Sequence, residues 1–178
     1  MRSFLLIAAF AAFVSPAQAA SFGGPLEPAA QGKLQCSAPN VERKTCAALS
    51  AYRTGENGGL EIVTSMLVAP KPPVIMETTS AVEIKDGRVC GIFKLRDIAN
   101  ADFTSDGKPL GEQHTYFLRD KLEAALERFA NREVCSAYLT QGVVIKAKST
   151  LDGVDQPKFD QVFIWVSPQE GYKVGGPN

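Results

Sequence analysis

Short segments of the chain alternate apolar and polar residues with the two-residue period of a β-strand. Residues 82–85 follow this pattern, and the Asp-Gly pair after them predicts a hairpin turn into a strand over 88–93. In that register Cys90 lies opposite Glu83, on the face of the hairpin away from Val82 and Ile84. Apolar, β-branched runs bounded by turn residues predict further strands over 60–69, 74–76, 134–139, 143–147 and 162–166.

Two other segments have the helical period. A single apolar stripe predicts a long helix over 111–131, and its members are Leu118, Leu122, Ala125, Leu126 and Phe129. Asn40 as an N-cap, followed by apolar positions at helical spacing, predicts a short helix that ends near Tyr52.

The order of these elements predicts an α+β fold with a single domain. Hairpin turns favour a mostly antiparallel sheet, with one long and one or two short helices packed on it. We place the domain at 34–174, after a flexible leader at 20–33 that is rich in glycine, proline and alanine, and before a flexible tail at 175–178. We expect no internal repeat.

Residues 1–19 have the three zones of a signal peptide. Arg2 precedes an apolar run over 4–14, and Ala17-Gln18-Ala19 supplies the small residues that a signal peptidase accepts. The run is too short to span a bilayer, so we expect no membrane anchor. The sequence therefore predicts a soluble mature chain from Ala20, in the periplasm or secreted.

The cysteines fit an oxidising compartment. All four lie beyond the predicted signal peptide, and an even number in an exported chain indicates two disulfides with three possible pairings. We favour Cys36–Cys46, which are close in sequence, and Cys90–Cys135, which would join a strand to the segment after the long helix. Structural bridges are favoured over redox or zinc chemistry because no Cys-x-x-Cys occurs.

The balance of charge argues against a nucleic-acid partner. The whole chain has 19 basic and 19 acidic residues, and loss of Arg2 with the signal peptide leaves about minus one. A nucleic-acid-binding protein normally has a basic excess, because phosphate contacts supply most of its affinity. We therefore expect no nucleic-acid partner.

Catalytic and cofactor motifs are not found in the sequence. His114 is the one histidine, which excludes multi-histidine metal sites, and its place at a helix start favours an exposed surface residue. Motifs for a serine nucleophile, a nucleotide phosphate or calcium do not occur. We predict no metal and no cofactor, and name no catalytic residue.

Two weaker groups of side chains remain as candidates. Asp97, Asp102 and Asp106 form the densest carboxylate group, and paired carboxylates hydrolyse glycosides, although such residues more often solvate a loop. Trp165 and Tyr172, near the end of the last strand, are a candidate ligand patch, although such aromatics more often seal the edge of a core.

Several short stretches together resemble a group of small exported alphaproteobacterial proteins of unknown function. The residues that carry the resemblance are the Cys36 to Cys46 segment with Ala47-Ala48-Leu49, Met76-Glu77-Thr78, Val89-Cys90-Gly91, and Trp165-Val166-Ser167-Pro168 with Gly171-Tyr172. The resemblance implies a periplasmic or secreted location and implies no activity.

We therefore favour a non-enzymatic binding or interaction protein, with an unknown protein or small molecule as its partner. The alternative is a carboxylate-dependent hydrolase of the cell envelope that uses the three aspartates. The oligomeric state stays open.

Overall fold

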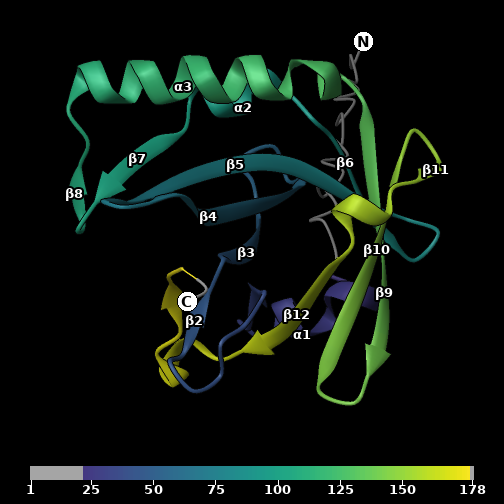
Figure 1. The fold of residues 1–178 in the computed structure, drawn as a ribbon. Helices are drawn as coiled ribbons and strands as arrows, with labels where there is room; N and C mark the ends of the chain where they lie inside the picture. The colour runs from purple at the N-terminus through teal and green to yellow at the C-terminus, as the bar shows by residue number, and fades with distance from the viewer. Residues whose placement is uncertain (1–21, 177–178) are drawn as a thin grey trace, which may run out of the picture.

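The computed structural model describes residues 22–176 (Figure 1), so the predicted signal peptide and the last two residues lie outside it. The helices are α1 (Glu27–Ala30), α2 (Leu95–Ala99) and α3 (Glu112–Leu126). The strands are β1 (Leu34–Ser37), β2 (Thr45–Cys46), β3 (Ala48–Thr54), β4 (Leu60–Pro70), β5 (Pro73–Lys85), β6 (Arg88–Ile92), β7 (Asp102–Ser105), β8 (Lys108–Pro109), β9 (Glu133–Gln141), β10 (Val144–Leu151), β11 (Val154–Asp155), β12 (Gln161–Val166) and β13 (Lys173–Val174). Four 3₁₀ turns complete the described elements: η1 (Gly24–Leu26), η2 (Glu127–Phe129), η3 (Pro157–Phe159) and η4 (Pro168–Glu170).

Eight strands close into an antiparallel barrel. They follow one another in the order β4-β3-β1-β12-β10-β9-β6-β5, and β5 pairs again with β4. The predicted α+β class, the mostly antiparallel sheet, the long helix as α3 and the presence of short helices are confirmed, but the short helices are α1 and α2. The closure of the sheet was not predicted.

Asp-Gly pairs make the tight turns between strands. At Asp86-Gly87 and Asp152-Gly153 both residues have positive φ, the backbone that a two-residue hairpin of this type requires. The first turn sets the predicted register, with Cys90 opposite Glu83.

The long helix packs on a second core beside the barrel. In Figure 1, α3 runs across the top of the molecule, with α2 beneath it and β5 and β7 below. Leu118, Leu122 and Leu126 of the predicted stripe pack against a buried cluster that includes Met76 and Phe103. Ala125, also part of the predicted stripe, is exposed.

The prediction that residues 20–33 form a flexible leader is wrong for residues 24–30. These residues form η1 and α1, where Leu26 is fully buried and packs with Tyr52 and Leu60 inside one end of the barrel. Burial of an apolar side chain holds the segment in place despite its glycine and proline content.

Within 22–176, no helix has the length and hydropathy to cross a membrane.

The predicted short helix that ends near Tyr52 is also wrong. The segment contains β2 and β3 instead, and Asn40 accepts a hydrogen bond from the Arg43 amide in a turn at 3.0 Å. Leu49 and Tyr52, on one side of a helix by spacing, lie on opposite faces of β3. Pairing of β3 with both β1 and β4 supplies more stabilisation than an isolated short helix would have.

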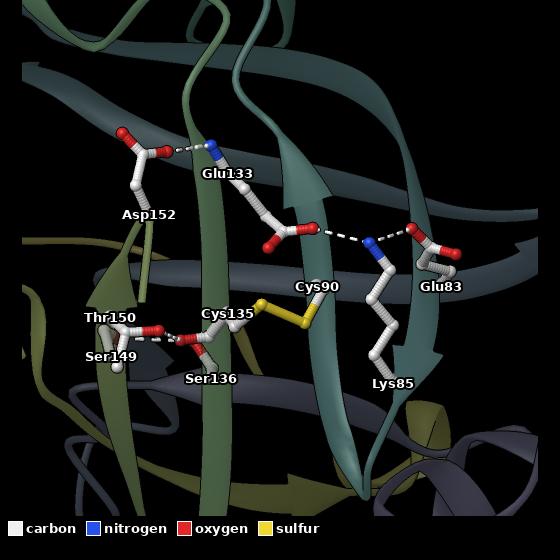
Figure 2. The surroundings of a disulfide bond; sticks show 9 residues. All are labelled: Glu83, Lys85, Cys90, Glu133, Cys135, Ser136, Ser149, Thr150 and Asp152. Carbon is white, nitrogen blue, oxygen red and sulfur yellow. Dashed lines mark hydrogen bonds and ion pairs between the residues drawn. A yellow bond between two sulfur atoms is a disulfide. The ribbon is translucent and has the colours of Figure 1, made fainter. Parts of the chain in front are cut away.

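Both predicted disulfides are present. Cys36–Cys46 joins β1 to β2, and Cys90–Cys135 joins directly paired residues of β6 and β9. Figure 2 shows the second bridge on the outer face, with Lys85 between the carboxylates of Glu83 and Glu133, at 2.9 and 2.6 Å. The hydrogen bond to Glu133 raises the pKa of Lys85 most, and the hydrogen bond to Glu83 raises it further.

A cavity inside the barrel as candidate binding site

A cavity of about 540 Å³ occupies the barrel lumen. Alternate residues of each strand point into the barrel, and many of those that line the cavity have small side chains. The small lining residues are Ser37, Ser50, Thr64, Ser80, Gly91, Ser136, Ala147 and Ser149. An eight-stranded barrel with large inward side chains would be filled by them, whereas these leave room for a small ligand.

Three polar side chains form the floor of the cavity. Tyr52 and Tyr138 each donate a hydrogen bond to Gln35 Oε1, at 2.9 and 3.1 Å, and the two phenolic oxygens lie 2.9 Å apart. Below this floor, Leu26 and Ala29 seal the end of the barrel. We call Gln35, Tyr52 and Tyr138 the floor triad.

Burial keeps both tyrosines of the floor triad in their neutral form. Desolvation raises the pKa of Tyr52 well above its ordinary value, and the neighbouring Tyr138 raises it further. Desolvation also raises the pKa of Tyr138, while its hydrogen bonds to Tyr52 and Gln35 act in the opposite direction. Three oxygen-to-oxygen contacts here share only two phenolic hydrogens, so the triad retains capacity to accept a further hydrogen bond.

Two hydroxyl pairs lie above the floor on opposite walls. Ser50 Oγ on β3 is 2.9 Å from Thr64 Oγ1 on β4, and Ser136 Oγ on β9 is 3.2 Å from Ser149 Oγ on β10. Three strands separate β3 from β9 in either direction around the barrel. The two pairs therefore face each other across the lumen, and we call them the hydroxyl pairs.

The two walls carry the same short motif. Residues 48–54 read ALSAYRT and residues 134–140 read VCSAYLT, so both contain Ser-Ala-Tyr and a threonine at matching positions. The serines belong to the hydroxyl pairs and the tyrosines to the floor triad. Sequence reasoning missed this set, because we expected no internal repeat. The shared motif was the pattern that would have revealed it.

Aromatic residues line the other end of the cavity. Phe93 follows β6, Phe129 lies in η2 at the end of α3, and Phe159 lies in η3. The rings of Phe129 and Phe159 meet edge to face with centroids 5.2 Å apart. The exposed Lys158 stands beside them. We call this end the mouth.

The three candidate aspartates do not form one site. Asp97, in α2, accepts a hydrogen bond from Ser80 Oγ at 2.7 Å. Asp102 is exposed and lies at the start of β7, opposite Glu77. Asp106 lies in the turn between β7 and β8 with φ of 50°. Aspartate tolerates this left-handed backbone conformation, which explains why an aspartate occupies the turn.

The candidate aromatic patch is divided by the sheet. Trp165 points into the barrel, where its ring lies 6.1 Å from that of Tyr52. Tyr172 packs outside, against the cluster around the Cys36–Cys46 disulfide. A second hollow, of about 670 Å³, brings Tyr172 near Asp102 and Glu77 on that outer side. Its carboxylates are not buried, so nothing there holds a reacting group in a low-dielectric setting.

His114 is exposed in the first turn of α3, as predicted for a surface histidine. It does not line either cavity.

Comparison with protein-family models, with curated proteins and with solved structures found no match to this chain.

Proposed function

We propose that this chain is an exported binding protein whose barrel lumen holds one small molecule. The observation that carries the proposal is the 540 Å³ cavity with polar side chains converging on it from opposite walls. Its volume lies within the range of about 300–1,000 Å³ that is typical of small-molecule sites. The two disulfides support export, because such bridges persist in oxidising compartments.

The binding role is favoured over the hydrolase. Within the described lining of the lumen there is no carboxylate or histidine, and the three candidate aspartates are held in separate elements. Paired carboxylates catalyse glycoside hydrolysis only when they flank one bond. Serine, threonine and tyrosine hydroxyls without an adjacent base bind a ligand but lack the activation that a nucleophile needs.

Native mass spectrometry of the protein purified from its own periplasm or medium tests the proposal. We expect a species heavier than the disulfide-bonded chain, with the added mass released as a small molecule on denaturation. Ser136→Phe places a large ring in the lumen and should abolish the added mass. Ala137→Phe is the matched control, because the next residue of β9 points to the outer face.

Two results would contradict the proposal. One is a wild-type mass equal to that of the chain alone. The other is an added mass that Ser136→Phe retains, since the molecule would then be bound outside the lumen. Circular dichroism of both variants checks that each one folds.

A further inference from the structure

We infer that the ligand of the lumen is an uncharged amphiphile, with a hydrogen-bonding head at the floor triad and an apolar body that extends to the mouth. This inference rests on the proposed function and adds the chemical class of the ligand and its orientation.

The charge of the lining excludes an ionised group deep in the lumen. Among the described residues that line the cavity, Lys158 is the one with a formal charge, and it lies exposed at the mouth. Asp97 is not among the lining residues, and its carboxylate already accepts a hydrogen bond from Ser80 Oγ and has an ion pair with Arg96 at 3.8 Å. A carboxylate or ammonium at the floor would be desolvated without a counter-charge, which is strongly unfavourable.

The floor is nevertheless built for a polar group. Gln35 uses only its Oε1 atom in the floor triad, so its amide nitrogen is left as a donor, and the three oxygens retain acceptor capacity. The Ser50–Thr64 pair has two hydroxyl hydrogens for one contact, so it can still donate as well as accept. Ser149 Oγ already donates to the Phe159 carbonyl oxygen at 3.1 Å, so the Ser136–Ser149 pair on the opposite side adds acceptor capacity. A neutral hydroxyl or amide head is satisfied by such a set, whereas a pure hydrocarbon would leave it unsatisfied.

The rest of the lining suits an apolar body. From the floor to the mouth, the polar side chains are interleaved with aliphatic ones, and the mouth itself is aromatic. The apolar lining residues include Ile62, Met66, Val82, Val134, Leu126 and Phe129. Apolar surface placed against them leaves water, which stabilises the complex in proportion to the area buried.

Two fluorescent probes of similar size test the charge requirement. N-phenyl-1-naphthylamine is uncharged, and 1-anilinonaphthalene-8-sulfonate has nearly the same rings with one sulfonate. We expect the uncharged probe to bind wild type and Ala137→Phe at least about tenfold more tightly than the sulfonate. Ser136→Phe should bind neither in the lumen. High ionic strength removes any attraction of the sulfonate to Lys158.

Displacement of the uncharged probe tests whether the ligand's head group is uncharged and lies at the floor triad. 1-Decanol and decanamide should displace it, whereas decanoate and decyltrimethylammonium, which have the same chain, should not. Tyr138→Phe removes one hydroxyl of the floor triad, so decanol should displace about threefold to tenfold less effectively. Tyr116→Phe, an exposed tyrosine of α3, is the matched control and should leave displacement unchanged.

The outcomes separate the two ideas. If the sulfonate binds as tightly as the uncharged probe, and Ser136→Phe abolishes both, the lumen binds ligands but the uncharged class is wrong. If decanol displaces equally from wild type and Tyr138→Phe while Tyr138→Phe still binds the uncharged probe, the head does not lie at the floor. If Ser136→Phe changes the binding of no probe, the proposed function itself fails.

Discussion

At the scale of single residues, the buried polar side chains distinguish this barrel from one with a filled core. Gln35, Ser37, Ser50 and Ser149 are all less than one-tenth exposed, and each lines the lumen. Burial of a polar group is unfavourable unless it finds a partner, and the floor triad and hydroxyl pairs supply partners for Gln35, Ser50 and Ser149. They leave spare hydrogen-bonding capacity on the side of the cavity.

The buried phenols make stability depend on alkaline pH. Both ionise near pH 10 in the unfolded chain, while burial raises the pKa of each in the folded protein. The unfolded state therefore loses these protons first, and the stability they contribute below pH 10 is lost as pH rises. We expect the free energy of unfolding to fall above pH 10 by up to about 1.4 kcal/mol per pH unit for each phenol.

Urea denaturation at a series of pH values measures this slope. Tyr52→Phe/Tyr138→Phe should be less stable than wild type at neutral pH but should show a shallower decline above pH 10. Tyr116→Phe keeps both buried phenols and should match the wild-type slope. A double variant with an undiminished slope would show that other groups cause the alkaline loss.

A second prediction concerns His114. His114 is exposed at the start of α3 and lines neither cavity, so we expect that His114→Ala leaves function intact. The free energy of unfolding should change by no more than about 0.5 kcal/mol. Complementation of a deletion strain, with expression confirmed by immunoblot, measures the effect. A folded His114→Ala protein that failed to complement would return histidine chemistry to consideration.

At the scale of elements, α3 joins two parts of the fold. Its apolar stripe covers the core beside the barrel, and its last turn together with η2 brings Leu126 and Phe129 to the mouth of the lumen. The opposite face of α3 is exposed, with Tyr116 and Phe117 at 72% and 57%. The helix thus contributes to stability along its stripe and to the cavity only at its end.

Substitutions on the two faces of α3 should differ in cost. Leu122→Ala removes a partly buried side chain from the core beside the barrel and should reduce the free energy of unfolding by about 2 kcal/mol. Phe117→Ala, on the exposed face, should change it by no more than about 0.5 kcal/mol. Urea denaturation of both variants tests the comparison. Equal costs would contradict the assignment of the buried stripe.

At the scale of the whole molecule, closure of the barrel depends on contacts between distant parts of the chain. β1 pairs with β12 near the other end of the sequence, and β6 pairs with β9 beyond α3, whereas β4 and β5 form a hairpin. Cys90–Cys135 joins two neighbouring strands of this ring, β6 and β9, and Cys36–Cys46 joins β1 of the ring to β2 outside it. Loss of either bridge acts mainly by freeing the unfolded chain.

The two bridges should contribute unequally. Their cysteines are 10 and 45 residues apart, and the chain-entropy model gives about 3 kcal/mol for Cys36–Cys46 and about 4 kcal/mol for Cys90–Cys135. Cys90→Ser/Cys135→Ser should therefore lose more stability than Cys36→Ser/Cys46→Ser, as urea denaturation of both double variants would show. A larger loss for the short bridge would contradict the loop-length account.

Local rules recovered much of the fold. The hairpin at Asp86-Gly87, the stripe of α3 and both disulfides depend on neighbouring residues or on cysteine spacing, and the structure confirms each of them. The segment ending at Tyr52 was misassigned because its spacing also suits a helix. There the competing strand pairing comes from residues elsewhere in the chain.

By itself, the sequence determined most strand segments, the Asp-Gly turns and the long helix, because these follow from backbone sterics and short-range periodicity. It left three cysteine pairings possible and favoured the one that the structure contains. Only the tertiary structure decided that the sheet closes, which face of each strand points inward, and that two Ser-Ala-Tyr motifs meet across a cavity. Alternation shows that a strand has two faces but does not identify the enclosed one. That choice is made when strands far apart in the sequence pair and the sheet closes around its inward side chains.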